Sequence, residues 1–146
     1  IRCRRKGVSS KAIHQRQFFI FRYHILMGRI TLQGLDFHGF HGLYPEEKEK
    51  GNRFTVDVHI DVPFSPSVLE DKLEGTIDYS VVYGLIRSEM EKPRGLLEGL
   101  AITIAGNIRT SFPAIERVTV SVSKHNPPIG GTCEKTTVTV TDPPGY

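Results

Sequence analysis

The sequence predicts an α+β domain in which a four-stranded antiparallel sheet carries two helices on one face. Four segments alternate apolar and polar residues as strands do, and two others have apolar residues at helical spacing. These segments follow one another in the order β-β-α-α-β-β. Pairs of strands on either side of two helices favour an antiparallel sheet with a single helical layer.

The four strand-like segments each have one apolar face. The clearest covers residues 54–62, where apolar residues at the even positions alternate with Thr, Asp and His. Residues 30–37 predict the first strand, with a bulge at Gly34, where the alternation is interrupted. Residues 117–124 and 135–141 predict the last two strands.

The two helical segments lie between the second and third strands. The first can be capped by Asp78 or Ser80 and is broken by residues 93–95, Pro-Arg-Gly. Its apolar positions are Val82, Leu85, Ile86 and Met90. The second has the richer apolar face: Leu96, Leu97, Leu100, Ala101, Ile104, Ala105 and Ile108.

Two loops complete the domain. Residues 38–51, rich in glycine and charge, are expected to form a long loop. Residues 126–131, Asn-Pro-Pro-Ile-Gly-Gly, follow the third predicted strand directly after Lys124 and His125. Two prolines stop a strand ladder and restrict the backbone, so Lys124 is held at the tip of its strand. An amine held in this way is placed for chemistry.

The charge is divided between an N-terminal arm and the rest of the chain. Residues 1–28 contain seven of the 19 Lys and Arg residues and no Asp or Glu, which leaves 12 basic and 16 acidic residues in 29–146. We expect residues 1–27 to be a basic arm outside the fold, either transit-like or upstream read-through, and residues 28–146 to form the domain. The expected location is the cytoplasm, or an organelle if the arm is a genuine transit segment.

Composition excludes several classes of protein. No stretch approaches the ~18 to 20 apolar residues that a membrane span needs. Cys3 and Cys133 provide neither a disulfide framework nor metal-ligand spacing, and His38, His59 and His125 show no metal spacing either. The acidic balance of the body gives no sign of nucleic-acid binding.

Four segments, taken together and in this order, resemble the dihydroneopterin aldolase family of the tunnelling fold. The resemblance covers residues 28–140, and the expected secondary structure separates the segments. They are Gly39-Phe40-His41-Gly42 followed by Pro45-Glu46-Glu47 and Gly51; Thr76-Ile77-Asp78-Tyr79; Leu96-Leu97-Glu98; and Lys124-His125-Asn126-Pro127-Pro128-Ile129.

The resemblance implies a lyase of folate biosynthesis. It would cleave 7,8-dihydroneopterin by a retro-aldol reaction into 6-hydroxymethyl-7,8-dihydropterin and glycolaldehyde, and members of the family commonly epimerise the side chain as well. The dihydropterin ring has a C=N bond beside the breaking carbon–carbon bond, so it can accept the electrons itself. The reaction therefore requires no metal, no cofactor and no lysine Schiff base.

The resemblance also implies catalytic roles. Lys124 would be the general acid and base near the side-chain hydroxyl and N5, although a lysine at a strand end is otherwise an ordinary solvent-exposed residue. Glu47 would position Lys124 and the substrate, with Glu46 as the alternative, because both lie in a charge run typical of a solvated loop. Tyr79 would relay a proton and contact the substrate, where packing is the structural alternative.

Ring binding is implied for three further residues. Glu98 would accept two hydrogen bonds from the 2-amino group and N3–H of the pterin, although a carboxylate there also favours the helix dipole. Leu97 would add backbone contacts and Ile77 an apolar or main-chain contact. His41, in a tight glycine loop, is interpreted as structural rather than catalytic.

The expected partners are a small pterin substrate and further copies of the chain, with no nucleic acid and no membrane. The predicted sheet has two open edges, and edge-to-edge pairing would close several sheets into a barrel. The resemblance implies an octamer of two four-subunit rings with active sites across subunit boundaries. Gly130-Gly131 and Asp78 depart modestly from the family pattern and could shift substrate preference.

Three alternatives stay open. A dihydroneopterin triphosphate epimerase would invert the side chain without releasing glycolaldehyde. If the chain were a pterin-binding protein without catalytic activity, Lys124→Ala would leave its function, pterin binding, unchanged. A nucleic-acid-binding module that uses the basic arm would lose binding when residues 1–26 are deleted.

Overall fold

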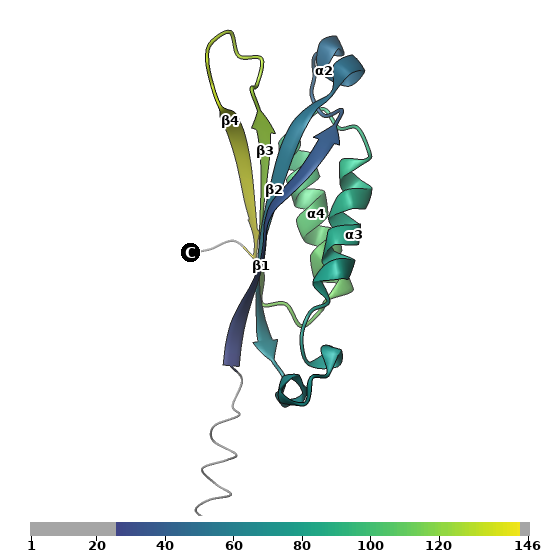
Figure 1. The fold of residues 1–146 in the computed structure, drawn as a ribbon, viewed down its shortest axis with the longest axis vertical. Helices are drawn as coiled ribbons and strands as arrows, with labels where there is room; N and C mark the ends of the chain where they lie inside the picture. The colour runs from purple at the N-terminus through teal and green to yellow at the C-terminus, as the bar shows by residue number, and fades with distance from the viewer. Residues whose placement is uncertain (1–25, 144–146) are drawn as a thin grey trace, which may run out of the picture.

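The computed structural model describes residues 26–143 and has the predicted α+β architecture (Figure 1). A short helix and two 3-10 helices are added to the six predicted elements. The elements are β1 (Leu26–Gly39), α2 (Pro45–Lys50), β2 (Asn52–Phe64), η1 (Pro66–Glu70), η2 (Leu73–Gly75), α3 (Tyr79–Met90), α4 (Leu97–Ser111), β3 (Arg117–His125) and β4 (Lys135–Asp142).

The four strands of the described residues form one antiparallel sheet in the order β1-β2-β3-β4. The register of β1 and β2 shifts between Leu32 and Leu35, and Gly34 has φ 73°. The register shift confirms the bulge predicted at Gly34. Glycine suits this position because it adopts a left-handed backbone conformation without a steric penalty. β1 and β4 form the two edges of the sheet.

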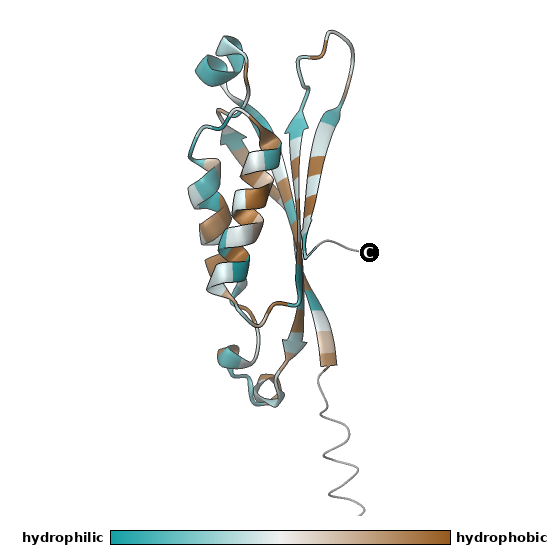
Figure 2. Cartoon of the chain, turned by 180° about the vertical axis from the view of Figure 1, so that it is seen from behind, coloured by the Kyte–Doolittle hydropathy of each residue, from teal (hydrophilic) through white to brown (hydrophobic). Residues whose placement is uncertain are grey.

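Helices α3 and α4 cover one face of the sheet, and their apolar sides point toward it (Figure 2). The even-numbered residues from Phe54 to Val62 on β2 and from Val118 to Val122 on β3 are buried between the two layers. Burial of each such side chain contributes roughly 1.5–3 kcal/mol to folding. The opposite face has a row of hydroxyl pairs between β3 and β4 instead: Thr119 with Thr141, Ser121 with Thr139, and Ser123 with Thr137.

The two long helices begin differently. Asp78 caps α3, because its carboxylate accepts a hydrogen bond from the backbone N–H of Ser80 at 2.8 Å. α4 follows Leu96 and has no side-chain cap. The first backbone N–H groups of α4 therefore lack partners within the helix and are available to a ligand.

The prediction of a continuous loop over residues 38–51 is wrong. β1 continues to Gly39, and residues 45–50 form the helix α2. Pro45 at the first helical position and acidic residues in the first turn stabilise this short helix. The charged residues 46–50 are therefore helical, and each side chain points in a direction set by its position on the helix.

The predicted arm of residues 1–27 lies almost entirely outside the described residues. β1 begins at Leu26, which pairs with Phe64 of β2. The boundary between arm and domain stays a prediction. Within residues 26–143, no helix is long and apolar enough to cross a membrane.

Candidate active site

Lys124 lies on the face of the sheet that carries the helices. It continues the row formed by Val118, Val120 and Val122, because alternate residues of a strand share a face. Its cross-strand partner on β2 is the buried Phe54, and the centroid of the Phe54 ring lies 5.7 Å from the ammonium nitrogen of Lys124. A lysine at the end of a buried apolar row needs a partner for its charge.

Glu47 is that partner. Its Oε1 atom accepts a hydrogen bond from Nζ of Lys124 at 2.7 Å, and both side chains are only 9% exposed. The neighbouring Glu46 is exposed and pairs with Lys50, one helical turn along α2. Helix α2 thus separates two adjacent carboxylates, one facing Lys124 and the other facing solvent.

The environment of Glu47 favours its ionised form. Partial burial by itself would raise the pKa of this carboxyl group. The hydrogen bond and charge of Lys124, together with backbone N–H groups of Tyr44 and Leu43, outweigh that effect and lower the pKa. An ionised carboxylate can hold the ammonium group of Lys124 in one position.

A cavity of about 530 Å³ opens beside the ion pair. Its walls come from the start of α4, the loop before α2, and the loop between β3 and β4. Leu97 and Glu98 line it together with Lys124 and Glu47. Among residues 26–143 the carboxylate of Glu98 has no hydrogen-bond or ion-pair partner, and it lies next to the uncapped N–H groups of α4. The cavity therefore combines a free carboxylate, backbone donors and a lysine–glutamate pair.

Ile77 and Tyr79 lie at the other end of the molecule. Tyr79 begins α3, whereas the loop that follows the opposite end of α3 borders the cavity. Figure 1 shows the two ends of α3. The 12 residues of α3 place its two ends ~17 Å apart. Tyr79 is 66% exposed, and Ile77 is buried. Four of the six predicted site residues thus meet in one cavity, and these two do not.

His41 is buried in the loop between β1 and α2, as the structural interpretation expects. Its Nδ1 accepts a hydrogen bond from the backbone N–H of Arg94 at 3.2 Å. Its ring packs edge-on against Phe54, with the centroids 5.0 Å apart. Within the described part of the chain, no group of three or more His, Cys, Asp or Glu residues is arranged to hold a metal ion.

The surroundings that orient Glu47 were not predicted from the sequence. Gly42 lines the cavity and Arg94 is hydrogen-bonded to Gly42, yet neither residue had a predicted role. The signal for α2 was present in Pro45 followed by two glutamates, a typical helix start. No local pattern links Arg94 to the loop at Gly42, because this contact joins residues about fifty positions apart.

Comparisons with known proteins place the chain in one family. The family model described as dihydroneopterin aldolase matches residues 30–141. A dihydroneopterin aldolase of Streptococcus pyogenes is 37% identical over 106 residues, which cover 72% of this chain and 89% of the relative. The enzyme of Bacillus subtilis is 34% identical over 116 residues, which cover 79% of this chain and 97% of the relative.

Solved structures share the fold. Escherichia coli dihydroneopterin aldolase in complex with neopterin matches with a TM-score of 0.71 at 17% identity, over 79% of this chain and 98% of that one. A Burkholderia dihydroneopterin aldolase bound to guanine matches with a TM-score of 0.62 at 23% identity, over 79% and 89% of the chains. The chain therefore belongs to the dihydroneopterin aldolase family, lyases that cleave 7,8-dihydroneopterin by a retro-aldol reaction in folate biosynthesis.

Proposed function

We propose that the lysine–glutamate pair performs the proton transfers of this cleavage in a site completed by a second copy of the chain. The observation that carries the proposal is the buried pair of Lys124 and Glu47, joined at 2.7 Å on the wall of the cavity. A charged pair at the end of an apolar row costs desolvation energy, and this cost is typical of functional sites.

The substrate supplies the electron sink, so the protein has to move protons. When Lys124 is in its neutral amine form, it takes the proton from the side-chain hydroxyl beside the breaking bond and becomes an ammonium group. As glycolaldehyde leaves, the carbon–carbon electrons form a double bond to the ring carbon, and the electrons of the ring C=N bond move to N5, which takes a proton from the ammonium group. The exocyclic carbon of this enamine then takes up a proton while N5 loses its own, which restores the C=N bond. Glu47 holds the amine in position throughout, through the hydrogen bond to Nζ. If glycolaldehyde presents its opposite face and the cleavage then reverses, the product is the epimer of the substrate. This route accounts for the epimerase activity.

Glu98 and Leu97 bind the pterin ring in this proposal. The unpaired carboxylate of Glu98 matches the 2-amino group and N3–H of a pterin, which form an edge similar to a guanidinium. Backbone N–H groups at the uncapped start of α4 suit the neighbouring ring carbonyl. Guanine has the same amino and carbonyl edge, and the related Burkholderia enzyme was crystallised with it.

Tyr79 and Ile77 reach the substrate from a neighbouring subunit. One dihydroneopterin, two fused rings with a three-carbon side chain, is too short to span the ~17 Å length of α3. The buried side chain of Ile77 leaves its main chain to contact the ring, and the exposed Tyr79 supplies the relay hydroxyl. The open edges of β1 and β4 support a barrel of paired sheets, in an octamer of two four-subunit rings.

Mixed oligomers test the shared site. Co-expression of Lys124→Ala and Tyr79→Phe chains, purified through two different tags, should restore glycolaldehyde release to about a quarter of the native rate, because that fraction of sites receives both intact halves. A mixture of Lys124→Ala and Glu47→Gln chains is the matched control, since both changes affect the same half and no site becomes intact. Equal activity of the two mixtures would contradict the shared site. Recovery of an inverted side chain without glycolaldehyde would contradict the cleavage itself.

A further inference from the structure

Two loops that are distant in sequence meet behind Glu47. The backbone N–H of Gly42 donates to the carbonyl of Arg94 at 2.9 Å, and the backbone N–H of Arg94 donates to Nδ1 of His41 at 3.2 Å. A Cβ atom on Gly95 would lie 2.9 Å from the side chain of Leu43, so these loops also pack closely. We call the hydrogen-bonded contact of His41 and Gly42 with Arg94 the loop staple.

The loop staple determines where the carboxylate of Glu47 can lie. That carboxylate packs directly on Gly42, where a Cβ atom would be only 2.1 Å from Oε2. The same Oε2 accepts a hydrogen bond from the backbone N–H of Tyr44 at 3.2 Å. A shift of the backbone at residues 42–44 therefore moves Glu47 and the hydrogen bond that it makes with Lys124.

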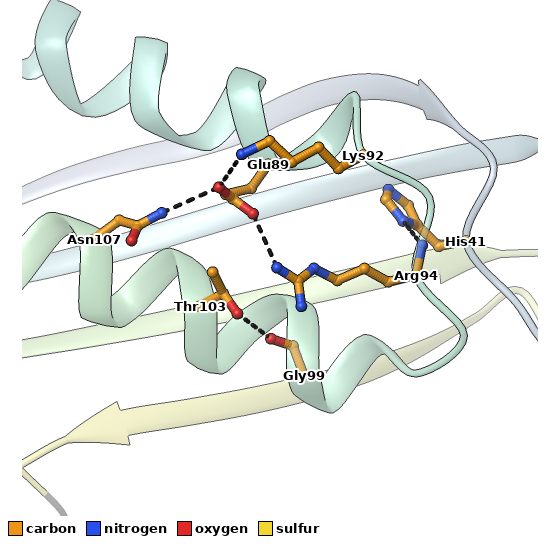
Figure 3. A network of polar contacts seen from close by, with 7 residues as sticks. All are labelled: His41, Glu89, Lys92, Arg94, Gly99, Thr103 and Asn107. Atoms are coloured by element: carbon orange, nitrogen blue, oxygen red, sulfur yellow. Dashed lines mark hydrogen bonds and ion pairs between the residues drawn. The ribbon is translucent and has the colours of Figure 1, made fainter.

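Arg94 is anchored on its other side by Glu89 (Figure 3). Glu89, near the end of α3, is 5% exposed and accepts hydrogen bonds from Arg94 at 3.1 Å, from Lys92 at 2.7 Å and from Asn107 of α4 at 3.2 Å. Hydrogen bonds from Lys92 are the largest cause of a lowered pKa of Glu89, so the carboxylate is ionised and holds the arginine. Through Glu89 the loop staple is thus connected to the last turn of α3 and to Asn107 within α4.

His41 contributes through one ring nitrogen. Because Nδ1 accepts the N–H of Arg94, the proton of the neutral ring is on Nε2. Complete burial lowers the pKa of His41, which keeps the ring neutral and its Nδ1 free to accept. The edge-on contact with Phe54 places His41 against the same ring that lies beside the ammonium group of Lys124. His41 therefore contacts the surroundings of both members of the ion pair and makes a hydrogen bond to neither of them.

We propose that His41 and Arg94 are positioning residues for proton transfer, which act by holding the Gly42 loop and, through it, the carboxylate of Glu47. This inference rests on the proposed roles of Lys124 and Glu47. It extends the active site from the residues that line the cavity to a second layer that reaches Glu89. Displacement of a catalytic group by about 1 Å can reduce turnover by up to 100-fold while the substrate still binds.

Steady-state kinetics of two His41 variants test the inference. His41→Leu fills the same space without an acceptor, and His41→Asn places a carbonyl oxygen near the position of Nδ1. We expect kcat for glycolaldehyde release to fall about 10- to 100-fold in His41→Leu, with KM within about twofold of the native value. We expect His41→Asn to recover most of that loss. Ile108→Val, a mild change in the buried core, is the control for lowered stability and should leave kcat within about twofold.

Arg94→Ala provides a second test that does not change a buried side chain. It keeps both backbone hydrogen bonds and removes only the anchor to Glu89, so we expect a smaller fall in kcat, roughly 3- to 10-fold. A kcat within twofold of the native value in folded His41→Leu, or the absence of any rescue by His41→Asn, would overturn the inference. If His41→Leu does not fold, an unchanged kcat in Arg94→Ala would overturn it.

Lys124→Ala, measured in parallel, separates this inference from the function that it rests on. Loss of turnover in Lys124→Ala with native turnover in His41→Leu would refute the positioning role alone. Native turnover in Lys124→Ala would refute the proposed acid–base role of the lysine as well.

Discussion

The two ends of the molecule carry functional residues in opposite states. At the Lys124 end, defined by Lys124, Glu47, Leu97 and Glu98, the charged pair is almost fully buried and bound to its neighbours. At the Tyr79 end, defined by Ile77 and Tyr79, the tyrosine at the start of α3 is largely exposed. The first end is a nearly complete environment for chemistry, whereas the second presents one side chain to solvent.

The two ends differ in what holds their functional side chains in place. A buried ion pair needs hydrogen-bond partners and packing contacts from the same chain, and here the backbone N–H of Tyr44 donates to Glu47 while the ring of Phe54 packs near the ammonium group of Lys124. An exposed tyrosine needs none of these and can be placed by a helix cap alone, as Asp78 places Tyr79. In the proposed assembly, the Lys124 end of one subunit meets the Tyr79 end of its neighbour. Substitutions at each end should therefore have different signatures.

The largest effect is expected at the Lys124 end. Lys124→Ala removes the proposed proton carrier, and we expect kcat for glycolaldehyde release to fall about 1000-fold, while the dissociation constant for a pterin changes little. Rapid-quench turnover and fluorescence titration measure the two quantities. Lys135→Ala, at the exposed start of β4, is the matched control and should behave as the native protein. A similar fall in kcat in Lys124→Ala and Lys135→Ala would contradict a specific role of Lys124 in proton transfer.

At the Tyr79 end we expect a smaller loss without any change in stability. Tyr79→Phe removes only the hydroxyl, so kcat should fall about 100-fold, as for the loss of one proton relay. The urea midpoint should stay unchanged, because the ring is mostly exposed. Tyr83→Phe, on the same helix and stacked on Phe37, is the control. Equal kinetics of the two variants would show that the Tyr79 end takes no part in catalysis.

Glu98 separates binding from proton transfer within the Lys124 end. Glu98→Gln keeps the shape of the side chain and removes the charge, which weakens two hydrogen bonds to the ring by about 1.5 kcal/mol together, or tenfold in KM. We expect kcat to stay within about threefold, since the ion pair of Lys124 is untouched. Initial rates over a range of dihydroneopterin concentrations measure both constants. A fall in kcat with KM unchanged would instead place Glu98 in the chemistry.

The smallest effect concerns pH and the buried histidine of the Lys124 end. Burial lowers the pKa of His41 below its ordinary value of 6.5, so the unfolded chain takes up this proton at a higher pH than the folded chain. The free energy of unfolding should therefore fall as pH decreases below 6.5, by at most about 1.4 kcal/mol per pH unit from this group. Urea unfolding at pH 7.5 and pH 5.5, at one protein concentration, measures the change. His41→Asn should show a smaller difference between the two pH values, and an unchanged difference would contradict this origin.

Much of the fold could be predicted because its causes are local. The alternation of residues 54–62, the bulge at Gly34 and the cap at Asp78 each depend on neighbours along the chain, and all three are present. The helix α2 was missed because its charge run was interpreted as a solvated loop, although Pro45 marks its start. That error also left Glu46 as the alternative to Glu47, and the directions of the two side chains on α2 distinguish them: Glu46 pairs with Lys50 and Glu47 with Lys124.

Local sequence patterns were sufficient to specify the α+β class, the strand that carries Lys124 and the family of the chain, because periodicity, capping and motif order are properties of neighbouring residues. Only the tertiary structure decided that Lys124 meets Glu47 across 77 positions, that Arg94 holds the loop at His41, and that Tyr79 lies at the opposite end. These contacts depend on how the helices pack on the sheet. Packing is set by the whole core, and no local segment contains that information.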